Sequence, residues 1–213
     1  MKRSSDRSKR VIGGIYSFAA DRLYEPLVVH GAFRLLGGRL NELVGEQGRR
    51  AVSGARGGPI LDLPVGTGYF AVEMARRHEG IVVGVDIAEG MARETAARRV
   101  GNLVAVQADA HHLPFADGTF RAVLCTNGLQ VMPGLVPSIR ELVRVLAPGG
   151  RFYVSVIGAP LGAVFRTETR EHLPTLVRPG KDVVAAIQAT GVHVTRHERV
   201  RLATLIEATK PNG

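Results

Sequence analysis

Short apolar runs alternate with amphipathic stretches over most of the chain. Runs rich in β-branched residues and bounded by turn residues are typical of buried strands. They predict strands at 59–63, 81–85, 103–107, 120–126, 152–157, 192–200 and 202–209. Apolar residues at three- and four-residue steps predict helices at 69–77, 88–99, 137–146 and 182–190. This alternation predicts an α/β fold, in which helices cover both faces of a parallel sheet.

The two ends of the chain depart from this alternation. The last two predicted strands are joined by a connection too short for a parallel crossover, so we expect them to pair antiparallel. Near the N-terminus, residues 23–44 carry a helical stripe, which is interrupted at His30 and weakened by glycines, so two shorter helices are an alternative to one. The glycine-rich residues 45–58 predict a helix end and a linker. These patterns divide the chain into a basic tail (1–12), a helical segment (13–58) and an α/β domain (59–213).

Charge adds one feature to this picture. The chain has 213 residues, a formal net charge of +9 and a sequence pI near 10.5. Residues 59–157 contain equal numbers of basic and acidic side chains, so the excess lies toward the two ends. An acidic partner such as nucleic acid, anionic lipid or a phosphorylated substrate would meet those ends first. The alternative is that scattered arginines only make the surface soluble.

Other compositional features narrow the setting. Cys125 is the single cysteine, which excludes an intrachain disulfide and a thiolate metal cluster. No helical pair of histidines supports a metal site, so we expect none, and we assign the adjacent His111 and His112 to the surface or to support of other residues. The apolar run at 11–20 contains Gly13, Gly14 and a tyrosine, which argues against a signal peptide. No run of 18 apolar residues is present, and we expect a cytoplasmic protein.

Three carboxylates mark the tips of three successive predicted strands. Asp62 opens a glycine-containing turn that ends at Gly68, before the first helix of the α/β domain, where backbone N–H groups can approach a ligand closely. Asp86 follows the second strand of that domain, and Asp109 follows the third. Buried carboxylates are costly unless something uses them. Helix capping explains each of them separately but the three together poorly.

Four segments in order carry a family resemblance. They are DLPVGTG (62–68), GVDIAEGM (84–91), DAHHLPFADGTF (109–120) and LVRVLAPGGR (142–151). The chain thereby resembles class I S-adenosylmethionine-dependent methyltransferases, and within them it is most similar to the ubiquinone and menaquinone C-methyltransferases. The resemblance covers residues 59–157. It implies a Rossmann-like, seven-stranded, mostly parallel sheet with an antiparallel last strand, and S-adenosyl-L-methionine as cofactor.

The resemblance also implies which residues of the first motif hold the methionine part of the cofactor. The turn would surround that part through Asp62, Pro64, Gly66 and Gly68. The family usually has glycine where Pro64 stands, and proline removes one N–H donor from the turn. The family commonly has an acid where Arg121 stands, so we assign that position no role.

The nucleoside part of the cofactor is assigned to the next two motifs in the same way. The resemblance implies that Asp86 binds the ribose and that Ile87 and Met91 flank the adenine. Asp109 and the Ala110 N–H would read the edge of the adenine ring. A dinucleotide-binding interpretation is disfavoured, because the turn is GxG rather than GxGxxG and such sheets do not need Asp109.

Residues outside the cofactor motifs are candidates for the acceptor side. Asn127, just past the fourth strand of the domain, could face the acceptor or the reactive methyl, or it could be only a turn residue. In similar enzymes the N-terminal segment folds over the cofactor as a lid, and there Tyr16 could contact the methionine carboxylate or the acceptor. His30 and His172 are candidate general bases, with an ordinary amphipathic histidine as the alternative for each.

The sequence therefore predicts a methyltransferase that moves a methyl group to an O, N or C atom of a small or lipid-like molecule. We expect the transfer to be an in-line displacement, in a pocket framed by residues 13–44, 127–134 and the insertion 158–180. The charge at the chain ends suits an anionic acceptor or peripheral contact with a membrane. One alternative is an RNA methyltransferase, which the net charge favours but the absence of an Asn/Asp-Pro-Pro-Tyr motif and the few aromatic residues disfavour. Another is a non-catalytic accessory protein that keeps the fold.

Overall fold

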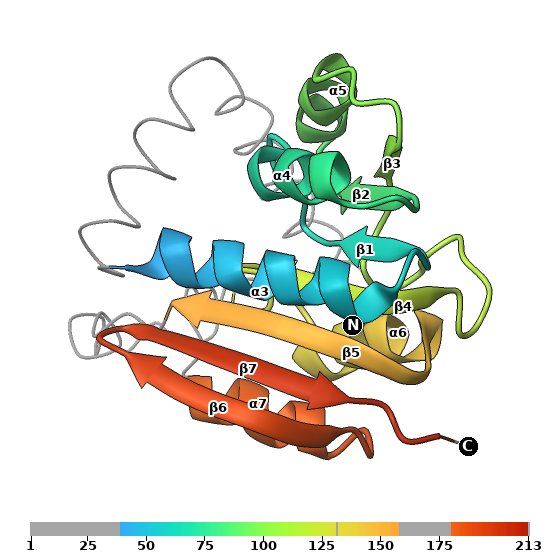
Figure 1. Ribbon diagram of the computed structural model, residues 1–213. Helices are drawn as coiled ribbons and strands as arrows, with labels where there is room; N and C mark the ends of the chain where they lie inside the picture. The colour runs from blue at the N-terminus through green and yellow to red at the C-terminus, as the bar shows by residue number, and fades with distance from the viewer. Residues whose placement is uncertain (1–38, 131, 158–179, 213) are drawn as a thin grey trace.

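The computed structural model describes residues 39–130, 132–157 and 180–212, and Figure 1 shows one seven-stranded sheet with helices packed against it. The strands are β1 (Ile60–Asp62), β2 (Val82–Asp86), β3 (Leu103–Gln107), β4 (Phe120–Thr126), β5 (Leu146–Ile157), β6 (His193–Val200) and β7 (Ala203–Thr209). The helices are α3 (Leu40–Ala55), α4 (Tyr69–Arg77), α5 (Glu89–Ala97), α6 (Leu135–Val145) and α7 (Gly180–Gln188). Among the described residues, none of the helices is long and apolar enough to cross a membrane.

The order of the strands confirms the predicted architecture. The sheet runs β3-β2-β1-β4-β5-β7-β6, with β1 to β5 parallel and β7 antiparallel to both of its neighbours. The chain order reverses at β1, which pairs with β2 on one side and β4 on the other. In open sheets of this kind, ligands bind beyond the carboxyl ends of the strands at such a reversal. The topology therefore predicts a ligand site at the carboxyl ends of β1 and β4.

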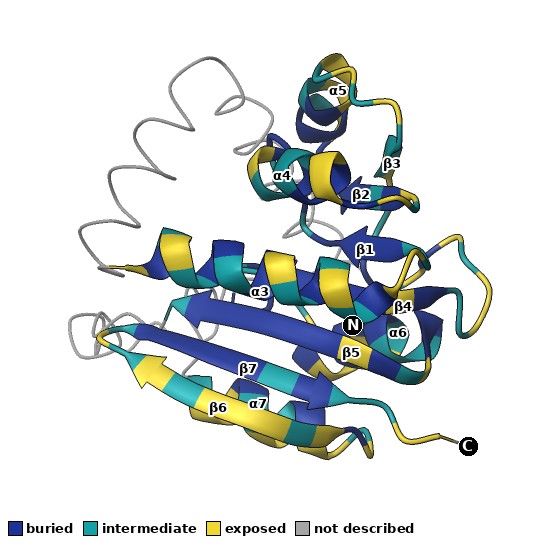
Figure 2. Ribbon diagram, viewed as in Figure 1, coloured by how far each residue is buried: buried dark blue, intermediate teal, exposed yellow. Residues whose placement is uncertain are grey.

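The central strands of the sheet are buried on both faces. Ile60 and Tyr153 pack with Ala51 of α3 and Met74 of α4, whereas Leu61 lies in a second cluster on the opposite face that includes residues of α6 and α7. Because side chains of a strand alternate between the two faces, strands covered on both sides read as continuous apolar runs. Figure 2 shows the strands β1 and β5 largely buried and the outward sides of the helices exposed.

Helix α3 corrects the expected linker at 45–58, because the helix continues through Ala55. The glycines there permit a close helix contact instead of ending the helix. A Cβ on Gly48 would lie 3.3 Å from Cγ of Met74 in α4, so the bare backbone lets the two helices approach. Burial of Val44 and Ala51 on the same helix adds apolar stabilisation that outweighs the low helix propensity of glycine.

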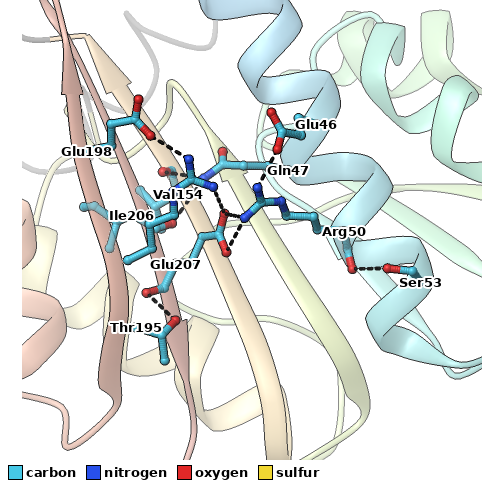
Figure 3. A network of polar contacts seen from close by, with 10 residues as sticks. Glu46, Gln47, Arg50, Ser53, Val154, Thr195, Glu198, Ile206 and Glu207 are labelled. Atoms are coloured by element: carbon cyan, nitrogen blue, oxygen red, sulfur yellow. Dashed lines mark hydrogen bonds and ion pairs between the residues drawn. The ribbon is translucent and has the colours of Figure 1, made fainter.

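Polar contacts also fix α3 to the sheet (Figure 3). The buried Gln47 amide donates hydrogen bonds to the carbonyls of Val154 (3.4 Å) and Ile206 (3.2 Å), which are register partners on β5 and β7. One turn later, Arg50 Nη1 lies 3.0 Å from Oε1 of Glu207 on β7. These contacts join residues far apart in the sequence, so α3 is part of the α/β core.

The structure changes one other expectation and leaves two untested. Residues 147–150, expected only to stop a helix, are included in β5, whose register with β4 shifts between Phe120 and Ala122. The predicted tail and most of the insertion lie outside the described residues. Of the predicted helical segment 13–58, the structure describes only residues 39–58, so its role as a lid stays a prediction.

Candidate cofactor site

The glycine turn after β1 has a conformation that requires glycine. Gly66 and Gly68 have φ angles of +55° and +83°, in the left-handed region that side chains with a Cβ disfavour. A Cβ on Gly68 would also come within 3.0 Å of Thr95 Oγ1, whose hydroxyl donates to the Gly66 carbonyl at 3.0 Å. Gly68 is the N-cap residue of α4. The N–H groups of Gly66 and Gly68 donate to Asp86 and to the Val65 carbonyl, so contacts within the protein hold the turn in this conformation.

Asp86, at the end of β2, is tied to the same turn. Its Oδ2 accepts the Gly66 N–H at 3.0 Å, and its Oδ1 accepts the Ala88 N–H at 2.9 Å. Burial raises the pKa of the Asp86 carboxyl, and the N–H groups of Ala88, Gly66 and Ile87 oppose this by stabilising the charged form. The carboxylate is thus held rigidly next to the position where the resemblance puts the ribose, and that contact stays a prediction.

Asp62, at the end of β1, is the most strongly perturbed acid of the site. Its side chain is buried, and among the described residues Oδ1 has no hydrogen-bond partner. Burial, followed by the nearby charge of Asp86, raises the pKa of Asp62 to about 7. A buried carboxyl that lacks partners is unfavourable in the protein alone. It is an arrangement in which a cationic ligand would provide the missing contact.

Further partnerless polar groups lie at the ends of β4 and β5. Four buried side-chain atoms here have no hydrogen-bond partner in the part of the chain that the structure describes: Oδ1 and Nδ2 of Asn127, Oε1 of Gln130 and Oγ of Ser155. Asn127 has a φ of +53°, and its N–H donates to the Ser155 carbonyl at 2.8 Å. Along the sheet, Ser155 is the register partner of Thr126, the last residue of β4. The partnerless groups therefore gather where the strand order reverses, beside Asp62.

Only part of this group of partnerless residues could be predicted from the sequence. Asn127 is a candidate from the sequence and Gln130 lies close to it in the chain, but Ser155 is not predicted. Its signal was a hydroxyl inside the apolar run FYVSVI, at the carboxyl end of a strand that is buried on both faces. Recognising it required knowing which strand lies beside β4.

The turn and the loop after β4 also touch. A Cβ on Gly128 would lie 2.3 Å from Cδ of Pro64, so the proline ring packs directly against the backbone that follows Asn127. Pro64, which stands where a glycine was expected, therefore connects the two loops that frame the site.

The third acid, Asp109, lies in the loop between β3 and β4. Its Oδ1 accepts the His111 N–H at 3.0 Å and lies 2.8 Å from Nδ1 of the His111 ring. Ala110 is buried. The expected contacts of Asp109 and Ala110 with adenine stay predictions, but the loop that carries them is well defined by contacts within the protein.

Helix α6 holds this loop through Glu141 and Arg144. Glu141 accepts the Leu113 N–H at 2.7 Å, and Arg144 donates to the carbonyls of Leu113 (3.2 Å) and Phe115 (2.8 Å). Arg144 also binds both oxygens of Glu141, at 2.8 Å each. The guanidinium of Arg144 lowers the pKa of Glu141. Arg144 belongs to one of the recognised motifs, but its supporting role was not predicted.

The remaining predicted residues are placed as follows. Ile87 is partly exposed beside the end of β2, whereas Met91 is fully buried in α5, and their places beside adenine stay predictions. Tyr16, His30 and His172 lie outside the described residues, so the structure does not place them.

Comparison with known proteins agrees with the motifs. Residues 60–150 match the family model described as a methyltransferase domain. A demethylmenaquinone methyltransferase from Beutenbergia cavernae is 39% identical over 128 residues, which are 59% of this chain and 52% of that protein. Its counterpart from Corynebacterium kroppenstedtii is 34% identical over 139 residues, covering 65% of this chain and 59% of that one. The chain thus spans a little over half the length of these relatives.

Solved structures agree on the fold. An S-adenosylmethionine-dependent methyltransferase from Aquifex aeolicus has a TM-score of 0.64 and 16% identity, covering 78% of this chain and 88% of that chain. A geranyl diphosphate C-methyltransferase from Streptomyces coelicolor A3(2), solved with S-adenosyl-L-homocysteine, has a TM-score of 0.66 and 14% identity, covering 81% and 80%. The ordered motifs, the family match and the sheet topology agree with one another: residues 60–150 are similar to methyltransferase domains, among them those of the demethylmenaquinone methyltransferases.

Proposed function

We propose that the protein transfers a methyl group from S-adenosyl-L-methionine to a ring carbon of a hydroquinone-like, lipid-soluble acceptor. The observation that carries the proposal is the group of partnerless, buried polar atoms beside the glycine turn. Asp62, Asn127, Gln130 and Ser155 contribute them from the ends of β1, β4 and β5. Such groups are rare in folded proteins unless a ligand satisfies them.

The cofactor fits the residues of this edge. When bound, it supplies a methyl group that is already activated on a positively charged sulfur. Asp62 in its ionised form would complement the positive charge of the methionine part. Asp86 would accept hydrogen bonds from ribose hydroxyls, since each carboxylate oxygen can accept more than one. Asp109 would accept from the adenine amine.

The acceptor side calls for a group that both donates and accepts hydrogen bonds. Gln130 Oε1 and Asn127 Oδ1 can only accept, whereas Asn127 Nδ2 donates and the Ser155 hydroxyl can do either. A ring hydroxyl satisfies both kinds of partner, but a quinone carbonyl only accepts. The relatives named as demethylmenaquinone methyltransferases support a ring of this class. We therefore favour the reduced, hydroxylated form of the ring.

The chain's role in the reaction is mainly to position and to exclude water. The cofactor would supply the methyl group without its bonding electrons, and the acceptor's ring carbon would supply the electron pair of the new bond. The proton of that carbon would then pass to a base, for which His30 and His172 stay the candidates. A hydroxyl next to that carbon makes it electron-rich, and Asn127, Gln130 and Ser155 would fix its orientation. Holding the two reactants in line in a dry site supplies much of the rate enhancement in such displacements.

The test is methyl transfer by the purified full chain. Radiolabelled cofactor is incubated with a short-chain demethylmenaquinone in detergent, with and without prior chemical reduction, and in parallel with total RNA. We expect label in the reduced quinone, with loss of about tenfold or more of the rate in Ser155→Ala and none in the exposed control Asp182→Asn. Label that enters only RNA, or transfer that is equal for the oxidised ring, would contradict the proposal.

A further inference from the structure

His111 contacts the Asp109 side chain through both its backbone and its ring. One carboxylate oxygen, Oδ1, takes both the backbone N–H and the ring Nδ1 of His111, at 3.0 and 2.8 Å. An aspartate side chain otherwise rotates freely about its last bond, because the energy wells there are broad. Two hydrogen bonds to the same oxygen fix that rotation. His111 thus determines how the Asp109 carboxylate is turned.

Helix α6 holds the other side of the His111 ring. Nε2 lies 3.4 Å from Oγ of Ser138, which in turn donates to the Gly134 carbonyl at 3.1 Å. Gly134, the N-cap residue of α6, has a φ of +70°, and a Cβ there would come within 2.8 Å of the same ring nitrogen. The ring therefore occupies a defined slot between the carboxylate and the start of α6.

This arrangement selects one tautomer of neutral His111. The ionised carboxylate of Asp109 can only accept, so Nδ1 carries the hydrogen and Nε2 is left as an acceptor, 3.4 Å from the Ser138 hydroxyl, whose one hydrogen can go to Nε2 or to the Gly134 carbonyl. The neighbouring His112 has an exposed side chain, and its backbone N–H donates to the Asp109 carbonyl at 2.9 Å, a contact that alanine would keep. His112 is therefore a matched control for the ring of His111.

We propose that His111 is a positioning residue that orients Asp109 toward the exocyclic amine of the cofactor's base and so sets selectivity for adenine. The inference rests on the proposed function, since it assigns the selectivity of the same cofactor site. A carboxylate turned correctly accepts from an amine, whereas it repels the carbonyl oxygen of a deaminated base. Loss of the His111 ring would remove one of the two hydrogen bonds to Oδ1, orient the carboxylate less firmly and weaken this discrimination.

The test compares two ligands that differ only along that edge of the base, where deamination replaces the amine with a carbonyl and places a hydrogen on the neighbouring N1. Binding of S-adenosylhomocysteine and of its deaminated counterpart, S-inosylhomocysteine, is measured by calorimetry on the full chain. The variants are His111→Ala, His111→Asn and the matched control His112→Ala, each checked for an unchanged melting temperature. Asparagine keeps an N–H donor close to the position of Nδ1 and so serves as the conservative rescue.

We expect wild-type protein and His112→Ala to prefer the adenine ligand by the same factor. In His111→Ala that preference falls about tenfold, mainly through weaker binding of the adenine ligand, and His111→Asn restores much of it. An unchanged preference in His111→Ala, or an equal loss for both ligands, would overturn the inference while leaving the cofactor assignment intact. Wild-type protein that binds neither ligand would overturn the proposed function and the inference with it.

Discussion

Replacing Asp62 with asparagine should make the ligand-free protein more stable at alkaline pH. Burial and the charge of Asp86 raise the pKa of Asp62 from 3.8 to about 7. The folded protein therefore binds a proton at this carboxyl more tightly than the unfolded chain does. The favourable contribution is fully present below the unfolded pKa and is lost as the pH rises through about 7. Asparagine has nearly the same shape and does not ionise.

The size of the effect follows from the same pKa. The full displacement corresponds to about 4 kcal/mol, at about 1.36 kcal/mol per pH unit. Because the unfolded carboxyl is already ionised at pH 5, the part lost between pH 5 and pH 8 is about 2–3 kcal/mol. Water entering the site near Asp62 would reduce the loss, so about 3 kcal/mol is its upper limit.

The assay is urea unfolding of ligand-free protein at pH 5 and pH 8. Wild-type, Asp62→Asn and a control, Asp182→Asn, are compared, because Asp182 is an exposed acid in the first turn of α7. We expect the free energy of unfolding of Asp62→Asn to rise relative to wild-type by about 2–3 kcal/mol on going from pH 5 to pH 8. The control should follow the wild-type. An identical pH dependence in Asp62→Asn and wild-type would refute the reasoning.

Three further substitutions test the supports of the site. Gly68→Ala should destabilise the protein by about 1–2 kcal/mol and abolish cofactor binding measured by calorimetry, because Gly68 has a positive φ that alanine disfavours. Gly101→Ala is the control and should be neutral, since a Cβ there meets nothing within 4 Å. Arg144→Met should lower the melting temperature and weaken cofactor binding, because it removes contacts to the loop at 108–119 that contribute about 1–3 kcal/mol. Unchanged cofactor binding would contradict the role assigned to Arg144. Gln47→Leu should cost about 1–2 kcal/mol in urea unfolding with cofactor affinity unchanged in the folded protein.

The sheet could be predicted from the sequence because its central strands are buried on both faces. The run at 120–126 coincides with β4, since a buried parallel strand needs apolar residues at nearly every position, and the run at 103–107 coincides with β3, which is a partly exposed strand at the edge of the sheet. The three acids Asp62, Asp86 and Asp109 could be placed at strand ends for the same reason. Each interrupts an apolar run at the point where the chain leaves the core.

The features that could not be predicted from the sequence depend on contacts between distant segments. The glycines of α3 looked like a linker, because their use in packing depends on Met74 being opposite Gly48. The hydroxyl of Ser155 stands out in its apolar run, but its place in the site depends on the neighbouring strand β4, and Arg144 acts on a loop about thirty residues away. Local pattern identifies an element, but it does not identify which element will lie beside it.

A cationic ligand should reverse the effect that ionisation of Asp62 has on the stability of the fold. Without ligand, ionisation of the buried carboxyl above pH 7 destabilises the fold. With S-adenosyl-L-methionine bound, the ionised form is the one that its positive charge stabilises, so binding releases a proton from Asp62 near neutral pH. The cofactor should therefore raise the melting temperature more at pH 8 than at pH 6, at the same free concentration. In Asp62→Asn the two increases should be equal and smaller, and an undiminished pH difference in that variant would assign the proton to another group.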